Sequence, residues 1–330
     1  MQAAPVGIRS ISAGVDFVYV MRRDTEYVSA QFASRLAATG HLAQIEDAYE
    51  HAVERIAEAV LAAFSATVEC PAVDLLDARE IHAQRLSLLD SLGPATVVSM
   101  DPLMEAGTLP LAFSRCYRIG GAEFIEMVPR PGYPTLEQQV ARIASVAGKG
   151  PIAVVEDDFF TGATLTTMLG QHLGDLLLQV RAVVAGTKVG PAEPDFPVLP
   201  AVRYVCADDT NPLEKVDLGD PRDYLVGASG LVCRLASGKL GRLPYVQPFV
   251  SPAARASIPV VAEAAFSAKA LEVSGDFYGE LSDIVGQPVT MDAADPAFAL
   301  ACEELLGIPQ DCGIAEALDI VAERGDALLC

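Results

Sequence analysis

Apolar positions recur with helical spacing in the first part of the chain. From residue 42 to residue 64 they fall on one face of a helix, which predicts an amphipathic helix. A second helix is predicted from about 77 to 92, where Gly93-Pro94 terminates it. A short apolar run at 16–21 predicts a strand ahead of both helices. We therefore expect residues 1–94 to form a mainly helical segment.

From residue 95 short apolar runs alternate with helical patterns. Strands are predicted at 96–100, 123–128, 152–155, 179–185 and 201–206. The helices predicted between them are 109–117, 136–146 and about 163–177. This alternation indicates an α/β fold with a mostly parallel sheet and helices on both of its faces. We assign residues 95–220 to this core region.

The last region, 221–330, begins rich in Gly and Pro and becomes helical after about residue 259. A hairpin is predicted near 237–242. Asp295-Pro296 has the residue types that begin a helix, and Gly307 is a typical helix stop. We expect an α+β region here that supplies an acceptor site or a covering loop.

Composition and charge limit the functions open to this chain. Of its 330 residues 51% are hydrophobic, which is enough for a substantial core. The net charge of −21 disfavours binding to nucleic acids and to anionic membranes. No apolar run approaches the roughly 18 residues of a membrane-spanning helix, and the first ten residues lack the apolar stretch of a signal peptide. Seven cysteines without a CxxC pair fit a reducing compartment, so we expect a cytoplasmic protein.

One segment carries a chemical signature, Ile152-Ala-Val-Val-Glu-Asp-Asp-Phe-Phe-Thr-Gly-Ala-Thr-Leu165. An apolar strand ends in three carboxylates, a Thr-Gly-x-Thr turn follows, and a helix then begins. In open parallel sheets ligands bind outside the carboxyl ends of the strands. N–H groups at a helix N-terminus bind phosphate, and carboxylates bind sugar hydroxyls, so the combination suits a sugar phosphate. The alternative is a helix-capping turn after an acid pair, with no ligand.

This segment resembles the fingerprint of the type I phosphoribosyltransferase family, over residues 152–164 closely and over 95–210 loosely. That fingerprint is four apolar residues, an acid pair, three mostly apolar or small residues, and Thr-Gly-x-Thr. The resemblance implies the sheet of that family and the activity of a pentosyltransferase. Such an enzyme transfers ribose 5-phosphate from phosphoribosyl pyrophosphate (PRPP) to an acceptor and releases pyrophosphate. It also implies a homodimer, with small molecules as the other partners.

The resemblance assigns roles to individual residues. Glu156 and Asp157 would hold the ribose hydroxyls and, with Arg130, are the expected catalytic residues. The family requires Mg²⁺, and Asp157 and Asp158 are the expected metal ligands, although Asp158 also fits a solvated turn. An aromatic residue stands where the 6-oxopurine enzymes have a catalytic Asp, which disfavours that substrate class. The residues expected to hold the 5-phosphate are Phe160, Thr161, Gly162, Ala163 and Thr164.

The family also uses a pyrophosphate loop and a mobile hood loop. The loop after the strand at 96–100 is expected to bind pyrophosphate, through Asp101, Gly107 and Thr108. A second stretch in the same context is Arg22-Arg23-Asp24. The hood position is taken by residues 128–133, from which Arg130 would reach pyrophosphate and Tyr133 would cover the site. This segment equally fits a Pro-rich surface turn.

A regional charge pattern stands apart from any family. Residues 224–262 contain four basic residues and no acidic one, in an otherwise acidic chain. We expect this stretch to face an anion, with Arg242 and Arg255 as contacts to pyrophosphate or the acceptor. The alternative is a hairpin whose arginines pair with acids elsewhere on the protein. In that case the stretch would have no role in binding.

Two other function classes remain open. The same fold serves proteins that sense PRPP or a nucleotide without catalysis, and the sequence shows no evident general base. The other class is an unrelated α/β protein whose acids bind the ribose of a nucleotide cofactor. The four histidines lack metal-ligand spacing, and neither a Walker loop nor a GxSxG elbow occurs. The sequence does not name the acceptor.

Overall fold

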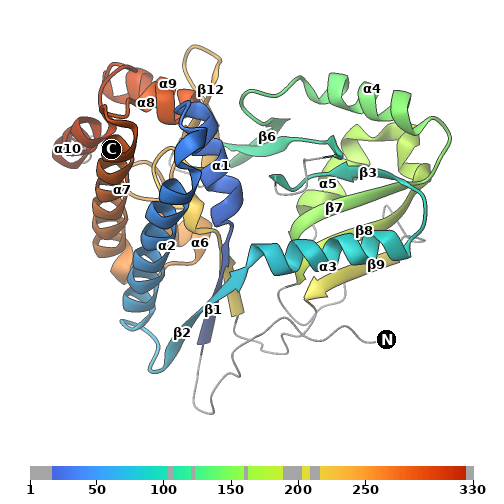
Figure 1. Ribbon diagram of the computed structural model, residues 1–330, viewed down its shortest axis with the longest axis horizontal. Coiled ribbons are helices and arrows are strands. Elements are labelled where there is room, and N and C mark those ends of the chain that lie inside the picture. Colours follow the sequence, from blue (N-terminus) through green and yellow to red (C-terminus); the bar gives the residue numbers. More distant parts are fainter. Residues whose placement is uncertain are drawn as a thin grey trace. The chain divides into compact units, whose positions relative to one another are not determined.

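The computed structural model describes six stretches of the chain (Figure 1). They form two compact units, which we describe separately. Unit 1 holds most of the predicted core region, and the predicted boundaries after 94 and 220 stay a prediction. The described residues are 17–102, 107–119, 123–159, 163–188, 203–208 and 216–324. Among them, unit 1 is drawn from Leu76–Ser114 and Met127–Val216, and unit 2 from Ser12–Leu75, Arg115–Glu126 and Asp217–Cys330.

Unit 1 contains a five-stranded sheet with the strand order β4-β3-β7-β8-β9. Every neighbouring pair in it is parallel. This confirms the predicted α/β class with parallel strands. The strands are β3 (Thr96–Ser99), β4 (Leu109–Pro110), β7 (Ile152–Phe159), β8 (Val180–Lys188) and β9 (Arg203–Asp208).

Helices cover both faces of this sheet, as the alternating pattern predicts. Helix α3 (Ala78–Ser91) packs along β8 and β9 on one face (Figure 1). Helices α4 (Leu136–Ala147) and α5 (Ala163–His172) belong to the apolar cluster on the other face. A strand covered on both faces needs a continuous apolar run, and Ile152–Val155 is such a run, fully buried.

Residues 109–117 form strands, so the helix predicted there is wrong. They make β4 and β5 (Phe113–Tyr117). Pro110 lacks an N–H group, which disfavours a helix interior but is tolerated on an edge strand, and β4 is the edge of its sheet. Strand β5 pairs with β11 (Leu231–Arg234), more than 100 residues away, and local spacing carries no sign of that partner. Tertiary pairing therefore overrides the local pattern.

Two other elements differ from the prediction in their ends. Strand β7 continues to Phe159, so the acid stretch lies inside the strand rather than after it. Helix α5 ends at His172, and the 3₁₀ helix η3 (Gly174–Gln179) replaces its predicted last turns. Gly174 has a φ of 53°, a left-handed conformation that favours glycine and interrupts the helix.

Unit 2 is built around a long helical pair, α2 (Leu42–Phe64) and α7 (Glu263–Val285), which pack against each other. Helix α2 has the bounds that the spacing of its apolar residues predicts, so the predicted helix is confirmed. The other helices are α1 (Thr25–Arg35), α6 (Pro252–Ala256), α8 (Met291–Ala294), α9 (Pro296–Leu306) and α10 (Ile314–Arg324). Two sheets have the orders β10-β1-β2 and β12-β11-β5-β6. Their remaining strands are β1 (Phe17–Arg23), β2 (Pro71–Asp77), β6 (Phe124–Pro129), β10 (Val216–Gly219) and β12 (Leu240–Leu243).

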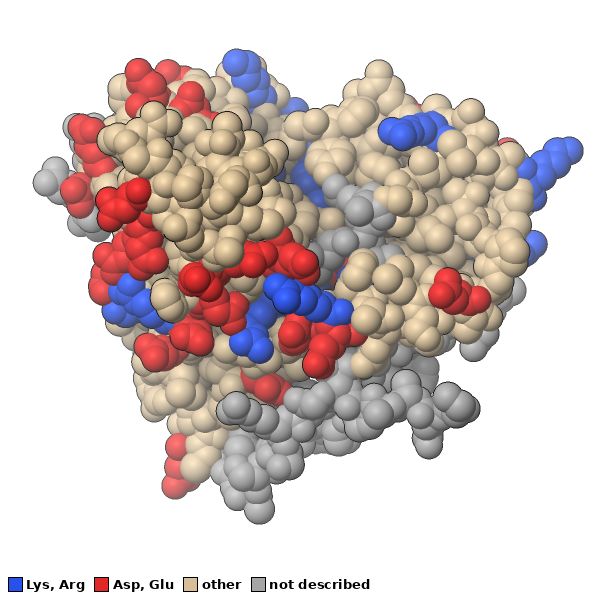
Figure 2. Space-filling view, viewed as in Figure 1, with Lys and Arg blue, Asp and Glu red and all other residues tan. Residues whose placement is uncertain are grey.

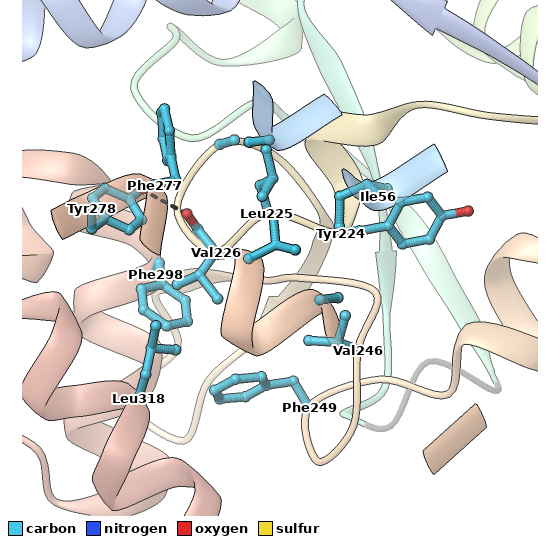
Figure 3. Packing of buried hydrophobic residues seen from close by; sticks show 14 of the residues in the cluster. Ile56, Tyr224, Leu225, Val226, Val246, Phe249, Phe277, Tyr278, Phe298 and Leu318 are labelled. Atoms are coloured by element: carbon cyan, nitrogen blue, oxygen red, sulfur yellow. Dashed lines mark hydrogen bonds between the residues drawn. The ribbon is translucent and has the colours of Figure 1, made fainter. Parts of the chain in front are cut away.

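Aromatic side chains fill the core of unit 2 (Figure 3). Phe277 and Tyr278 on α7 pack edge to face, and Phe298 on α9 packs against Phe249 in the same way. The Tyr278 hydroxyl donates to the Val226 carbonyl at 2.6 Å. A loop between strands is thereby fixed to the helical layer by both packing and a buried hydrogen bond.

A buried set of charges joins three segments of unit 2. At the end of β1, Arg22 pairs with Asp220 at 3.0 Å. Asp24 pairs with Arg222 in the 3₁₀ helix η4 (Pro221–Asp223) and accepts a hydrogen bond from the Tyr49 hydroxyl at 2.9 Å. This set uses two members of the Arg22-Arg23-Asp24 stretch as internal ion-pair partners.

The exposed surface of unit 2 is acidic over its long helices (Figure 2). Among the described helices none combines the length and the apolar character that a membrane span requires. A surface of this sign repels polyanions at low ionic strength. The exposed acidic residues of α2 and α7 are Asp47, Glu54, Glu58, Glu272, Asp276, Glu280 and Asp283.

Candidate functional site at the carboxyl edge of the parallel sheet

Polar side chains gather where the parallel strands of unit 1 end. Because all five strands run in one direction, their carboxyl ends lie along a single edge. Asp101 follows β3, the acids 156–158 end β7, and Thr187 and Lys188 end β8. Asp158 lies opposite Thr187 in the register of β7 and β8. The acid motif is therefore on the sheet edge where ligands of open α/β sheets bind.

Glu156 holds a strongly perturbed carboxyl group at this edge. The residue is half-buried, but its Oε2 atom is inaccessible and has no hydrogen-bond partner among the described residues. Burial raises the pKa of the Glu156 carboxyl well above its usual range, and the charges of Asp157, Asp101 and Asp158 raise it further. A group in this state is stabilised by any ligand that brings a hydrogen-bond donor or a cation.

Asp157 and Asp158 offer oxygen ligands side by side. Each has a carboxylate oxygen within 4.8 Å of one on the other. The Asp158 N–H donates to Asp157 Oδ1 at 2.8 Å, which orients the first carboxylate. Both residues are half-buried. Such hard oxygen donors suit Mg²⁺, which typically takes one or two carboxylates and keeps its remaining positions for water and phosphate.

A buried ion pair lies beside the acid stretch on the α3 side of the sheet. Arg85 of α3 is 1% exposed and pairs with Asp101, which is fully buried. The same Arg85 Nη1 atom donates to the Glu156 carbonyl oxygen at 3.2 Å. Sequence analysis did not find this arginine. The available signal is its helical spacing, because Ala78, Ile81 and Arg85 share the buried face of α3.

Gly186 of β8 allows the strands to approach closely beside the acids. A Cβ atom there would lie 2.4 Å from the Asp157 carbonyl oxygen and 2.9 Å from Ile81 Cγ2. Because the first of these is a backbone atom, the overlap is relieved only by moving the strand.

We expect Gly186→Ala to lower the free energy of unfolding by about 1–3 kcal/mol, as overpacking does in other cores. Urea denaturation followed by circular dichroism measures the change. The matched control is Gly279→Ala in α7, where the added methyl meets open space. Equal stability of the two variants would contradict the close approach.

Asp101 is the innermost of the residues predicted for pyrophosphate. Its carboxylate forms an ion pair with Arg85. The Ser99 hydroxyl donates to the Asp101 carbonyl and accepts from the Asp101 N–H. Gly107 is exposed with a φ of 75°, and Thr108 is half-buried. The residues between them, 103–106, lie outside the described part of the chain.

The segment predicted as a hood is a tight turn between β6 and α4. The Tyr133 N–H donates to the Arg130 carbonyl at 2.9 Å, and Gly132 at φ 90° makes the bend. The Arg130 guanidinium lies 5.9 Å from the centre of the Tyr133 ring. Both side chains belong to unit 1, with the acids.

The predicted 5-phosphate turn is only partly described. Phe160, Thr161 and Gly162 lie outside the described residues. Helix α5 begins at Ala163, and Thr164 is half-buried in its first turn. Helix α5 therefore begins four residues after β7 ends, in the order that the motif predicts.

The two arginines predicted as anion contacts lie in unit 2 and have internal partners there. Arg242 pairs with Asp295 at 2.9 Å. Arg255 lies 4.0 Å from the centre of the Tyr117 ring and donates to the Tyr117 hydroxyl at 2.8 Å. Arg234, in the same acid-free stretch, pairs with Glu126. Two of these partners are the distant acids that the alternative interpretation requires.

Comparison with known proteins adds no relative: no family model, curated protein or solved structure matches this chain.

Proposed function

We propose that this protein is a Mg²⁺-dependent phosphoribosyltransferase that transfers ribose 5-phosphate from PRPP to an acceptor and releases pyrophosphate. The observation that carries the proposal is an acid stretch at the carboxyl end of a buried parallel strand, with helix α5 beginning at Ala163, four residues after the strand ends. Parallel strands with helices on both faces support a type I phosphoribosyltransferase fold. As in that family, we propose a homodimer in the cytoplasm.

The residues divide the chemistry between them. Departure of pyrophosphate leaves positive charge on the ribose ring, and carboxylates beside the ring stabilise that charge more than they stabilise the substrate. Glu156 and Asp157 would orient the ribose hydroxyls. Asp157 and Asp158 would hold Mg²⁺, which when bound neutralises the charge of pyrophosphate. The N-terminus of α5, with Thr164, would anchor the 5-phosphate.

Titration calorimetry with PRPP tests the proposal. We expect binding that depends on Mg²⁺ and that weakens at least tenfold in the double variant Glu156→Gln/Asp157→Asn. The amide at 156 is expected to keep the fold, because burial raises the pKa of this carboxyl and Gln carries no charge to desolvate. The control is Glu54→Gln/Glu58→Gln, which removes two exposed carboxylates from α2. No binding at millimolar PRPP, or equal binding by both double variants, would refute the proposal.

A second candidate is a PRPP-sensing protein that does not catalyse. It is favoured by Phe160, which stands where the 6-oxopurine enzymes have a catalytic Asp. Release of pyrophosphate separates the two candidates. An enzyme releases it when a suitable acceptor from a panel of nucleobases is added, whereas a sensor binds PRPP and leaves it intact.

A further inference from the structure

Thr187 is a buried polar residue that the proposed function leaves unused. It lies near the end of β8 and is 4% exposed. Its Oγ1 atom has no hydrogen-bond partner among the described residues. An unsatisfied buried hydroxyl costs free energy, so proteins retain few of them. A hydroxyl of this kind at the ligand-binding edge of a sheet points to a partner that is not part of the chain.

The strand pattern places Thr187 on the same face as Glu156 and Asp158. Side chains alternate between the two faces of a strand. Val183 and Ala185 of β8 and Val154 of β7 all pack in the cluster that contains α5, so we call this the α5 face. Thr187 follows Ala185 by two residues, and Glu156 follows Val154 by two. All three polar residues therefore continue the α5 face beyond its apolar part.

Register brings the hydroxyl close to the acids. Thr187 lies directly opposite Asp158, and Ala185 lies opposite Glu156. Neighbouring strands are about 4.8 Å apart, so Thr187 and Glu156 are diagonal neighbours across one strand gap. Diagonal positions of this kind are within reach of long side chains, so a ligand hydroxyl between the strands could contact both residues.

The opposite face of the same edge carries a buried internal ion pair. Val155 and Val184 pack against leucines of α3, so Asp157 and Gly186 continue that face. There Arg85 pairs with Asp101. Within the described residues, no ion pair involves Glu156 on the α5 face. Two buried nitrogens of Arg85 lack hydrogen-bond partners on the α3 side in the described part of the chain, whereas the unsatisfied oxygen acceptors of Glu156 and Thr187 lie together on the α5 face.

We propose that Thr187 and Glu156 together bind one hydroxyl group of the sugar ligand. The ligand hydroxyl would donate to Glu156 Oε2 and accept from Thr187 Oγ1. In its ionised form the Glu156 carboxylate only accepts hydrogen bonds, whereas a Thr hydroxyl also donates, so the pair matches both capacities of a sugar hydroxyl. This inference rests on the proposed function and adds a binding residue from a second strand to it.

Calorimetry on Thr187→Val and Thr187→Ser tests the inference, with PRPP and Mg²⁺ as the probe. Valine keeps the shape and removes the hydroxyl, so we expect binding about three- to tenfold weaker, the range for one hydrogen bond. Serine keeps the hydroxyl and is expected to bind like the wild type. The control is Thr96→Val at the amino end of β3, away from the carboxyl edge of the sheet. This variant is expected to leave binding unchanged.

Thermal unfolding supplies the readout that separates binding from structure. Because Thr187→Val removes an unsatisfied buried hydroxyl, its melting temperature is expected to equal or exceed that of the wild type. A lower melting temperature would show that the hydroxyl has a structural partner and would overturn the inference. Wild-type binding that Thr187→Val leaves unchanged would overturn the inference alone. Absence of wild-type binding would overturn the proposed function and the inference with it.

Discussion

Asp24→Ala is expected to lower the free energy of unfolding by about 3–5 kcal/mol, the typical cost of breaking a buried ion pair from one side. The Asp24 carboxylate is fully buried between Arg222 and the Tyr49 hydroxyl. Without it, two buried guanidinium groups, Arg22 and Arg222, share the carboxylate of Asp220. One carboxylate cannot neutralise two guanidinium groups, so part of their positive charge would stay buried and unpaired.

Denaturation by urea, followed by circular dichroism, measures this loss. The control is Glu123→Ala, because the Arg118–Glu123 pair is well exposed on both sides and such pairs contribute at most about 1 kcal/mol. If the two variants lose similar stability, the buried charges are solvated and the prediction fails.

Arg85→Met is expected to lower the free energy of unfolding of unit 1 by about 3–5 kcal/mol, because it too breaks a buried ion pair from one side. It removes the cation that compensates Asp101 and the donor that holds the Glu156 carbonyl. Methionine fills a comparable volume, so the loss reports on charge more than on packing.

The double variant Arg85→Met/Asp101→Asn provides the decisive comparison. It leaves no unpaired charge, and we expect it to recover at least half of the loss. Urea denaturation of the wild type, both single variants and the double variant completes the cycle. Additive losses would mean that Arg85 and Asp101 do not depend on each other, contrary to their contact.

Local signals predicted the elements whose cause is local. The apolar stripe of α2 gave its bounds, and Thr135 with Gln138 forms the capping box that begins α4. Asp295 accepts from the Ala297 N–H and begins α9, as its position before Pro296 predicts. The acid motif is likewise predicted from sequence, because an apolar strand, three acids and a helix start lie within one short segment of the chain.

Features that depend on distant partners were missed. Strand β5 exists because β11 pairs with it, and residues 113–117 alone do not reveal this. Arg85 resembles an ordinary helix residue in sequence, because its partners are distant: Asp101 in the loop after β3 and the carbonyl of Glu156 in β7. The acid-free stretch around Arg242 suggested an anion contact, since the carboxylate that pairs with it is about 50 residues away. A count of charged residues along the sequence does not show which of them form ion pairs in the folded protein.

The Asp295 carboxylate serves two elements at once, one oxygen capping α9 and the other pairing with Arg242 of β12. Neither function of this side chain can therefore be altered alone during evolution. A lineage that loses Arg242 leaves a buried charge at the helix cap, and one that loses Asp295 leaves the arginine of the hairpin without its acid. Positions 242 in the hairpin and 295 at the helix cap are therefore expected to covary.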